Sequence, residues 1–481
     1  MNLNEALPEL TSYLEERMTH RRVPGAVIGI VLGKEELIVA RGVTSVEHPL
    51  EVDATTLFQV GSRTKTFTGT ALMRQREAGK LDLDAPLVSY LPEFRLANPD
   101  YAGRVTPRHL LTHTGGWLGD YFLAVPLRGR GDDSLARLVD AMDRPPCLTA
   151  PGEIFSYNNA GFCVAGRLLE VLTGQSYEDA VRSLVLEPIG LSHTTYFPED
   201  VITERTAVGH IVRGDEPTVA RPWGISRSEH PTGGIISDVV DQLRYARFHL
   251  GDGTTAGGER LLSAETMADM QSVHAPAIGV RDAVGLPWLL GHVGGLRTVG
   301  HSGGMNGQMS AFTLAPERDF AISIFTNASS GGLLCGDVER WTFDYLFGVR
   351  DDAPKTLPLS SEELDEYTGA YAFGLLQVER EDDHLVLRRQ GIPGSELMEE
   401  TPPPTQLGFY DRDHVFDLGE PEEASARGQF LRDAEGRIRH LHYGGRLTPR
   451  FEGGASLETL LAAAPAASGG VRAATTALHR A

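Results

Sequence analysis

The sequence predicts an α+β fold: an antiparallel sheet that both ends of a first domain complete, followed by a small all-β domain. Three observations support this prediction. Short apolar runs lie near the N-terminus and recur near residues 309–326, and a series of helical segments separates them. Beyond residue 350 the segments become short and strand-like, with turn residues between them.

The first domain begins with an amphipathic segment over residues 3–19, which we expect to be a helix. Residues 26–32 and 36–40 then form two apolar runs with a turn between them, as expected of two paired strands. Five further helices and two late strands are expected, at 63–78, 107–113, 159–173, 176–187 and 238–250, and at 309–315 and 319–326. This order of strands, helices and strands is typical of an antiparallel sheet with an inserted helical region.

The Asp-Asp-Ala-Pro-Lys stretch after residue 350 predicts a domain boundary. We therefore divide the chain into a first domain over 1–350, a linker over 351–359 and a β-domain over 360–455. The segment 456–481 is rich in Ala, Ser, Gly and Thr and is expected to be a flexible tail.

The chain has 65 acidic and 44 basic residues, for a formal net charge of -21. This charge argues against nucleic acid and against anionic membrane surfaces as partners. The three cysteines are widely spaced and odd in number, which predicts neither a disulfide framework nor a zinc site. With no visible signal peptide and no long apolar run, the sequence predicts a cytoplasmic protein, and an oligomer is compatible with it.

Ser62 and Lys65 form the first candidate for chemistry. Their spacing places both side chains on one face at the start of a predicted helix, where free N–H groups favour negative charge. A shielded lysine can lose its proton and act as a base for serine. The alternative is a helix cap beside a solvated lysine. Against it, the chain has only four lysines, and Lys65 alone among them has a serine three residues before it.

Tyr157 and Asn159 form the second candidate, just before a predicted long helix. A phenol can shuttle a proton and an amide can hold a substrate. Considered alone, a turn with a half-buried tyrosine and an asparagine cap is the favoured interpretation.

The third candidate is the Gly-His-Ser-Gly-Gly segment over 300–304, just before the late strand pair. It matches the nucleophile elbow of α/β-hydrolases with Ser302 as nucleophile, but an elbow needs a helix directly afterwards, and the residues that follow alternate like strands. A glycine-rich turn is the alternative. His109 and His113 are four residues apart without an obvious third ligand, so neither a metal nor any other cofactor is expected.

Taken in order, these segments resemble the motifs of the serine β-lactamase and penicillin-binding protein superfamily, above all class C β-lactamases and related esterases and D-amino-acid peptidases. The matching motifs, which are far more specific together than singly, are Ser62-Arg63-Thr64-Lys65, Tyr157-Asn158-Asn159 and His301-Ser302-Gly303, supported by Leu110–Gly116 and Thr232–Ile235. The resemblance spans roughly residues 10–348. It implies a β-lactamase-like α/β/α sandwich with an antiparallel sheet and a helical subdomain.

The resemblance also implies roles for these residues. Ser62 would attack the carbonyl carbon, and Lys65 and Tyr157 would exchange its proton and pass it to the leaving group. The backbone N–H groups of Ser62 and Gly304 would form the oxyanion hole, and Asn159 would bind the acyl side of the substrate.

One departure from the superfamily pattern bears on the substrate. His301 stands where the superfamily has the lysine of its third motif, and an ordinary imidazole is only partly charged at neutral pH. We therefore expect a small-molecule substrate, an ester, amide or peptide that can include a D-amino acid, in preference to carboxylate-bearing β-lactams. The β-domain resembles the lipocalin-like barrel of some D-stereospecific peptidases and of thioesterases that cyclise nonribosomal peptides. Peptide cyclisation, β-lactam hydrolysis and an acylation-sensing pseudoenzyme remain the alternatives.

Overall fold

The first domain is built around an eight-stranded antiparallel sheet in the order β2-β1-β12-β11-β10-β9-β8-β7. The computed structural model describes residues 3–120, 131–277, 279–352, 354–371, 376–389, 403–419 and 427–451. The strands are β1 Gly25–Leu32, β2 Glu35–Gly42, β7 Ala275–Pro276, β8 Ala283–Val284, β9 Leu289–Val293, β10 Leu296–Met305, β11 Gln308–Ala315 and β12 Phe320–Thr326. Strand β1 pairs with β12 from Ala26↔Thr326 to Leu32↔Phe320, so the sheet is completed from both ends of the domain as predicted.

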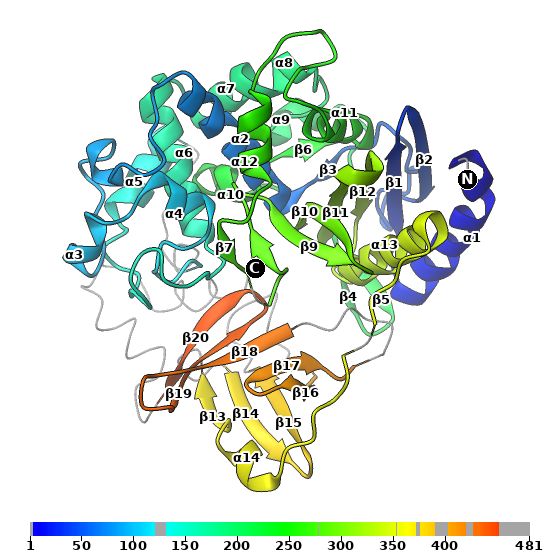
Figure 1. The fold of residues 1–481 in the computed structure, drawn as a ribbon. Helices are drawn as coiled ribbons and strands as arrows, with labels where there is room; N and C mark the ends of the chain where they lie inside the picture. The colour runs from blue at the N-terminus through cyan, green and yellow to red at the C-terminus, as the bar shows by residue number, and fades with distance from the viewer. Residues whose placement is uncertain are drawn as a thin grey trace.

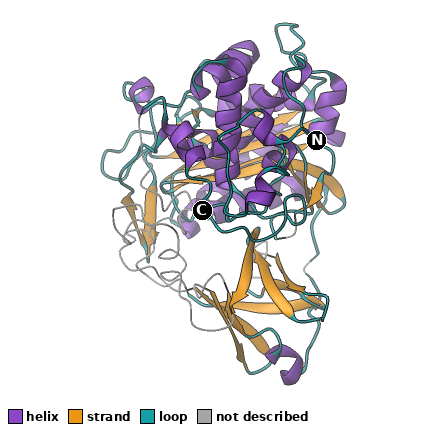
Figure 2. Cartoon of the chain, turned by 90° about the vertical axis from the view of Figure 1, so that its left-hand side faces the viewer, coloured by secondary structure: helices purple, strands orange, loops and turns teal. Residues whose placement is uncertain are grey.

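Helices cover both faces of this sheet (Figures 1 and 2). On one face, α1 (Leu3–Arg21) and α13 (Gly331–Phe347) bury apolar side chains against alternate residues of β1 and β12, such as Ile28 and Ile324. On the other face, α11 (Val239–Leu250) packs Leu243 into the larger core that contains Val27 and Phe325. Alternation along each strand thus supplies one apolar row to each layer, which gives the predicted α/β/α sandwich.

The helical region packs into the larger core, the one that contains Val27 and Phe325. Its central helix α2 (Thr64–Glu77) is buried over most of its length. Helix α6 (Asn159–Thr173), which has Asn158 as its N-cap, packs against α2. The shorter helices are α3 Pro99–Ala102, α4 Pro107–Leu111, α5 Ser134–Asp140, α7 Tyr177–Val181, α8 Glu187–Ile189, α9 Pro198–Val201, α10 His230–Gly233 and α12 Ala264–Met270. Two small sheets complete the domain, β3 Phe58–Gln59 with β6 Ile236–Ser237, and β4 His210–Arg213 with β5 Glu216–Val219.

A closed eight-stranded barrel follows and confirms the predicted all-β domain. It is preceded by α14 (Ser361–Asp365), and its strands are β13 Gly369–Tyr371, β14 Leu376–Glu381, β15 His384–Arg389, β16 Thr405–Asp411, β17 His414–Asp417, β18 Arg427–Arg432, β19 Ile438–Tyr443 and β20 Arg446–Phe451. Large side chains such as Tyr371, Phe409 and Phe430 pack together in one buried cluster. The boundaries of the linker stay a prediction, and the predicted flexible tail over 456–481 lies outside the described residues.

The third motif lies within a strand and not just ahead of the late strand pair, as the sequence suggested, nor in the glycine-rich turn of the alternative. Residues 301–304 lie within β10, where His301 pairs with Phe312 and Gly304 pairs with Met309 of β11. Glycine and serine in the segment suggested a turn, but small residues are needed here because another backbone approaches: a Cβ on Gly303 would lie 2.0 Å from the carbonyl oxygen of Val60.

Helix α10 is held by a buried ion cluster around Glu178. The carboxylate of Glu178 lies 2.8 Å from Arg227 Nη2 and 2.7 Å from His230 Nδ1. Burial alone would raise the pKa of Glu178, but the hydrogen bonds from His230 and Arg227 lower it to about 2. This cluster fixes the start of α10, whose Thr232 carbonyl belongs to the site described below.

Replacing Glu178 with glutamine is expected to lower the free energy of unfolding by about 3 to 5 kcal/mol, because it leaves the guanidinium charge of Arg227 without its buried carboxylate partner. The folded pKa of Glu178 lies below its unfolded value, so the stability it contributes is present above about pH 4.5 and is lost as the pH falls toward 2. Urea unfolding of both proteins from pH 7 down to pH 3 measures this. A difference that stays constant over that range would contradict it.

Candidate active site

Ser62 and Lys65 lie where a short 3-10 turn, η1 (Gly61–Arg63), continues into α2. Lys65 Nζ lies 3.0 Å from Ser62 Oγ and donates a second hydrogen bond, of 2.8 Å, to the carbonyl of Thr232. The Lys65 side chain is fully buried, whereas Ser62 is half-buried. Burial lowers the pKa of Lys65 well below that of an ordinary lysine, so a neutral amine can face the serine hydroxyl. The predicted pair is thus brought together, and the solvated lysine of the alternative is excluded.

Gly61 allows the third motif to approach this turn. Its φ is +57°, and a Cβ there would lie 2.6 Å from the backbone nitrogen of Gly304. Only glycine fits both constraints. The structure therefore places Gly304 beside the turn that carries Ser62, as the resemblance implied.

Tyr157 lies just before α6 and faces the serine and the lysine. Its ring centroid is 5.0 Å from Lys65 Nζ. Burial raises the pKa of Tyr157 well above its usual value, although a side-chain hydrogen bond with Ser62 acts in the opposite direction. The phenol therefore keeps its proton at neutral pH. The N-cap of α6 is Asn158, whose side chain accepts a hydrogen bond from Gly161 N. Asn159 is therefore not the capping residue.

Asn159 is held by two side chains that the sequence analysis did not single out. Its Nδ2 donates to Asp120 Oδ1 at 2.6 Å, and its Oδ1 accepts from Thr232 Oγ1 at 2.7 Å. Thr232 thereby contacts both Asn159 and Lys65. Thr232 belongs to the supporting motif Thr232–Ile235. Asp120 lies in no motif, and nothing in the sequence around it indicates a function.

His301 is fully part of the site, but its charge differs from the expectation. Its ring centroid is 6.1 Å from that of Tyr157, and its Nδ1 donates to the carbonyl of Ser302 at 2.6 Å. Burial, together with the nearby Lys65, lowers the pKa of His301 to about 3. The partly charged imidazole that we expected from the sequence is therefore a neutral ring at pH 7.

His113 supports Tyr157 and is not paired with His109. The two rings of His113 and Tyr157 stack at 4.4 Å with an interplanar angle of 21°, and His113 Nδ1 accepts from Asn158 N at 2.9 Å. His109 instead belongs to the capping box of α4 with Thr106. Within the described ranges, no group of three or more His, Cys, Asp or Glu side chains is close enough to hold a metal ion.

The β19–β20 hairpin of the barrel reaches this site (Figure 1). Its two-residue turn, Gly444-Gly445, has φ values of +57° and +75°, as a tight hairpin of this kind requires. Three hydrogen bonds join the hairpin to the segment that carries Tyr157: Tyr157 N to Gly445 O at 2.8 Å, Leu447 N to Ser156 Oγ at 3.2 Å, and His442 Nε2 with Phe155 O at 2.9 Å. The sequence analysis missed this contribution of the second domain.

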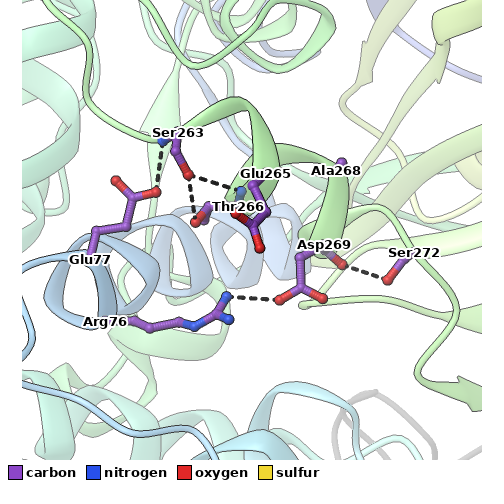
Figure 3. Close-up of a pocket in the computed structure, with 8 residues that line it drawn as sticks. All are labelled: Arg76, Glu77, Ser263, Glu265, Thr266, Ala268, Asp269 and Ser272. Carbon is purple, nitrogen blue, oxygen red and sulfur yellow. Dashed lines mark hydrogen bonds and ion pairs between the residues drawn. The ribbon is translucent and has the colours of Figure 1, made fainter.

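A separate surface pocket lies between the end of α2 and α12 (Figure 3). Several of its polar side chains are paired with one another or with backbone: Arg76 binds Asp269 at 2.8 Å, and Glu77 accepts from Ser263 N at 2.7 Å. The pocket shares no residue with the candidate site. Among the helices of the described residues, none has the length and apolarity needed to cross a membrane.

Comparisons with known proteins identify the family and the fold. Residues 10–338 match the Beta-lactamase family. Penicillin-binding protein 4 of Amycolatopsis lactamdurans is 34% identical over 338 residues, which cover 69% of this chain and 88% of that protein. The solved structure of SurE with D-Leu aligns with a TM-score of 0.71 and 27% identity over 92% of this chain and 99% of that chain, so the alignment includes the barrel.

A third comparison extends the likeness in fold to a smaller protein. The D-amino acid amidase of Ochrobactrum anthropi SV3 complexed with L-phenylalanine amide aligns with a TM-score of 0.59 and 23% identity, over 70% of this chain and 96% of that chain. The family match covers well over half of the chain and contains all three motifs. The chain therefore belongs to the Beta-lactamase family and is a serine hydrolase of that fold.

Proposed function

We propose that the chain hydrolyses small esters, amides or peptides through an acyl-enzyme on Ser62. The observation that carries the proposal is the fully buried Lys65, whose Nζ lies 3.0 Å from Ser62 Oγ and whose pKa burial lowers. A neutral amine at this distance can accept the serine proton as the hydroxyl oxygen attacks a carbonyl.

The remaining steps use the groups around this pair. Tyr157, which holds its proton at neutral pH, gives it to the leaving group and regains the proton that left Ser62. The N–H groups of Ser62 and Gly304 stabilise the oxyanion, and Asn159 binds the acyl side. Water then attacks the acyl-enzyme by the same proton transfers in reverse.

Two observations support esters, amides and peptides, including those of D-amino acids, over β-lactams. The neutral ring of His301 offers less attraction to a carboxylate than the lysine it replaces. SurE, which aligns over nearly the whole chain, has been solved with D-Leu. We propose transfer to an internal amine, which would cyclise a peptide, as the second candidate, because the closed barrel fits the thioesterases that the β-domain resembles.

A fluorophosphonate probe is expected to add one adduct to the wild-type protein, at Ser62, and none to Ser62→Ala. Intact-mass spectra measure the adduct, and p-nitrophenyl esters measure turnover. Labelling or full turnover in Ser62→Ala would overturn the proposal. An ester acyl group that stays on Ser62 without release would identify an acylation sensor instead. A panel of L- and D-amino-acid amides, nitrocefin and peptidyl thioesters then separates the substrate classes, since the cyclic product identifies transfer.

A further inference from the structure

The site lacks a cation where the superfamily pattern has one. The third-motif lysine is replaced by His301, whose ring lies 6.1 Å from the Tyr157 ring and is neutral at pH 7 because burial lowers its pKa to about 3. A positive charge near the tyrosine would favour the negative charge that develops on its oxygen as the proton leaves. The chain must obtain that charge elsewhere or work without it.

Arg446 brings a cation to the same tyrosine from the other domain. Arg446 is the first residue of β20 and directly follows the Gly444-Gly445 turn. Its Cζ lies 5.0 Å from the Tyr157 ring centroid. Its Nε donates to Asp120 Oδ2 at 2.7 Å, and the Asp120 side chain is only 6% exposed. Since Asp120 Oδ1 also binds Asn159, the guanidinium is fixed against the acyl side of the site.

We propose that Arg446 of the barrel is a positioning residue that supplies, beside Tyr157 and Lys65, the positive charge which the superfamily takes from its third-motif lysine. The inference rests on the proposed acyl-enzyme function. It makes the β-domain part of the catalytic apparatus through one side chain and the hairpin that carries it.

The charges around Lys65 and Tyr157 determine in which direction each neighbour shifts the pKa of Lys65. The side chains that face the two residues come from η1, α6, β10, β20, the residues just after α4 and the loop before residue 121. They are Ser62, Cys163, His301, Arg446, His113 and Asp120, of which all but Ser62 are titratable. Burial lowers the pKa of His113 and raises that of Cys163, so both are neutral at pH 7. Among the described groups named here, Arg446 and Asp120 thus carry the opposing charges. Burial is the largest effect and lowers the pKa of Lys65; Arg446 lowers it further, whereas Asp120 raises it and so opposes burial.

Arg446 itself exchanges no proton in this scheme. Lys65 takes the proton of Ser62 as the Ser62 Oγ–carbon bond forms. Tyr157 Oη–H gives its proton to the departing oxygen or nitrogen as that bond to carbon breaks, and the Lys65 proton returns to Tyr157. The guanidinium keeps its charge throughout and favours the neutral amine and the partly negative phenol oxygen.

The test measures kcat/KM against pH with p-nitrophenyl acetate, whose acyl group bears no carboxylate for Arg446 to bind. Arg446→Gln is expected to lose about tenfold or more, and its acid limb, set by protonation of Lys65, moves to higher pH. Arg446→Lys restores most of the rate. Asp120→Asn moves the acid limb the opposite way, to lower pH. In Arg446→Gln/His301→Lys, a lysine at the third motif restores part of the loss. Arg388→Gln, which removes an exposed barrel arginine paired with Glu379, is the matched control and keeps the wild-type profile.

Three results would overturn the inference. One is a wild-type rate and acid limb in Arg446→Gln. Another is a loss confined to carboxylate-bearing substrates, which would make Arg446 a substrate ligand. The third is an equal loss in Arg446→Gln and Arg446→Lys with an unmoved acid limb, which would indicate a structural role alone. If Arg446→Gln does not fold, the acid limb of Asp120→Asn provides the test: a shift to lower pH supports the inference, and an unmoved acid limb overturns it. Turnover that survives Ser62→Ala would instead remove the proposed function itself.

Discussion

Replacing Lys65 with methionine is expected to lower kcat/KM for p-nitrophenyl esters by about a thousandfold or more while raising the stability of the fold. The loss follows because Nζ, 3.0 Å from Ser62 Oγ, is the base in the proposed mechanism, and a positioned base contributes about 10² to 10⁴ in rate. Methionine has a similar length and no charge, and it leaves the surrounding core filled.

The gain in stability has a pH dependence of defined sign. The folded pKa of Lys65 lies well below its unfolded value of about 10.4, so folding at neutral pH must remove a proton or bury a charge. That penalty is greatest below the folded pKa and disappears as the pH rises to the unfolded value. Urea midpoints of Lys65→Met and wild type should therefore differ most at neutral pH and converge near pH 10. A less stable Lys65→Met protein at pH 7 would contradict this account, and Lys80→Met is the control, since Lys80 is exposed.

Replacing Tyr157 with phenylalanine is expected to lower kcat/KM by about 10² to 10⁴, with the size of the loss set by the leaving group. Burial keeps the phenol protonated well above neutral pH, so its function in the proposed cycle is to give that proton to the departing atom. A p-nitrophenolate needs little protonation to leave, whereas an alkoxide or an amine needs a full proton. The loss should therefore be smallest for p-nitrophenyl esters and largest for amides.

The comparison of substrates provides the control for this variant. Phenylalanine keeps the stack with His113, whose ring lies 4.4 Å from that of Tyr157, so the substitution removes the hydroxyl and leaves the packing of the site in place. Equal losses for p-nitrophenyl esters and amides would assign Tyr157 to the attack of Ser62 and not to the leaving group. Unchanged amide turnover would exclude it from the proton path.

The fold and three motifs could be predicted because local patterns determine them. Apolar alternation in residues 26–32 and the cap and glycine at the ends of the 159–173 helix specify their elements without knowledge of the rest of the chain. Lys65 could be singled out because lysine is rare in this composition.

The partners that the sequence did not indicate depend on contacts between distant segments. Asp120 belongs to no motif, and its function appears only when Asn159 and Arg446 meet it from two domains. Arg446 is one of many arginines, and nothing in its neighbours distinguishes it. The charge state of His301 depends on burial, which an unperturbed pKa cannot supply. A turn was the alternative for the third motif because close packing of two backbones selects the same small residues that turns do.

The hairpin at Gly444-Gly445 also bears on when activity arises during synthesis. Ser62 is synthesised early in translation. Gly445, which accepts a hydrogen bond from Tyr157 N, and Arg446 follow it by more than 380 residues. Domains generally fold in order as they emerge, and contacts of such long sequence separation form late. A nascent chain with a folded first domain would therefore hold Ser62 and Lys65 in place while its tyrosine segment still lacked these contacts. In the proposed mechanism the complete site therefore forms only after the barrel has folded.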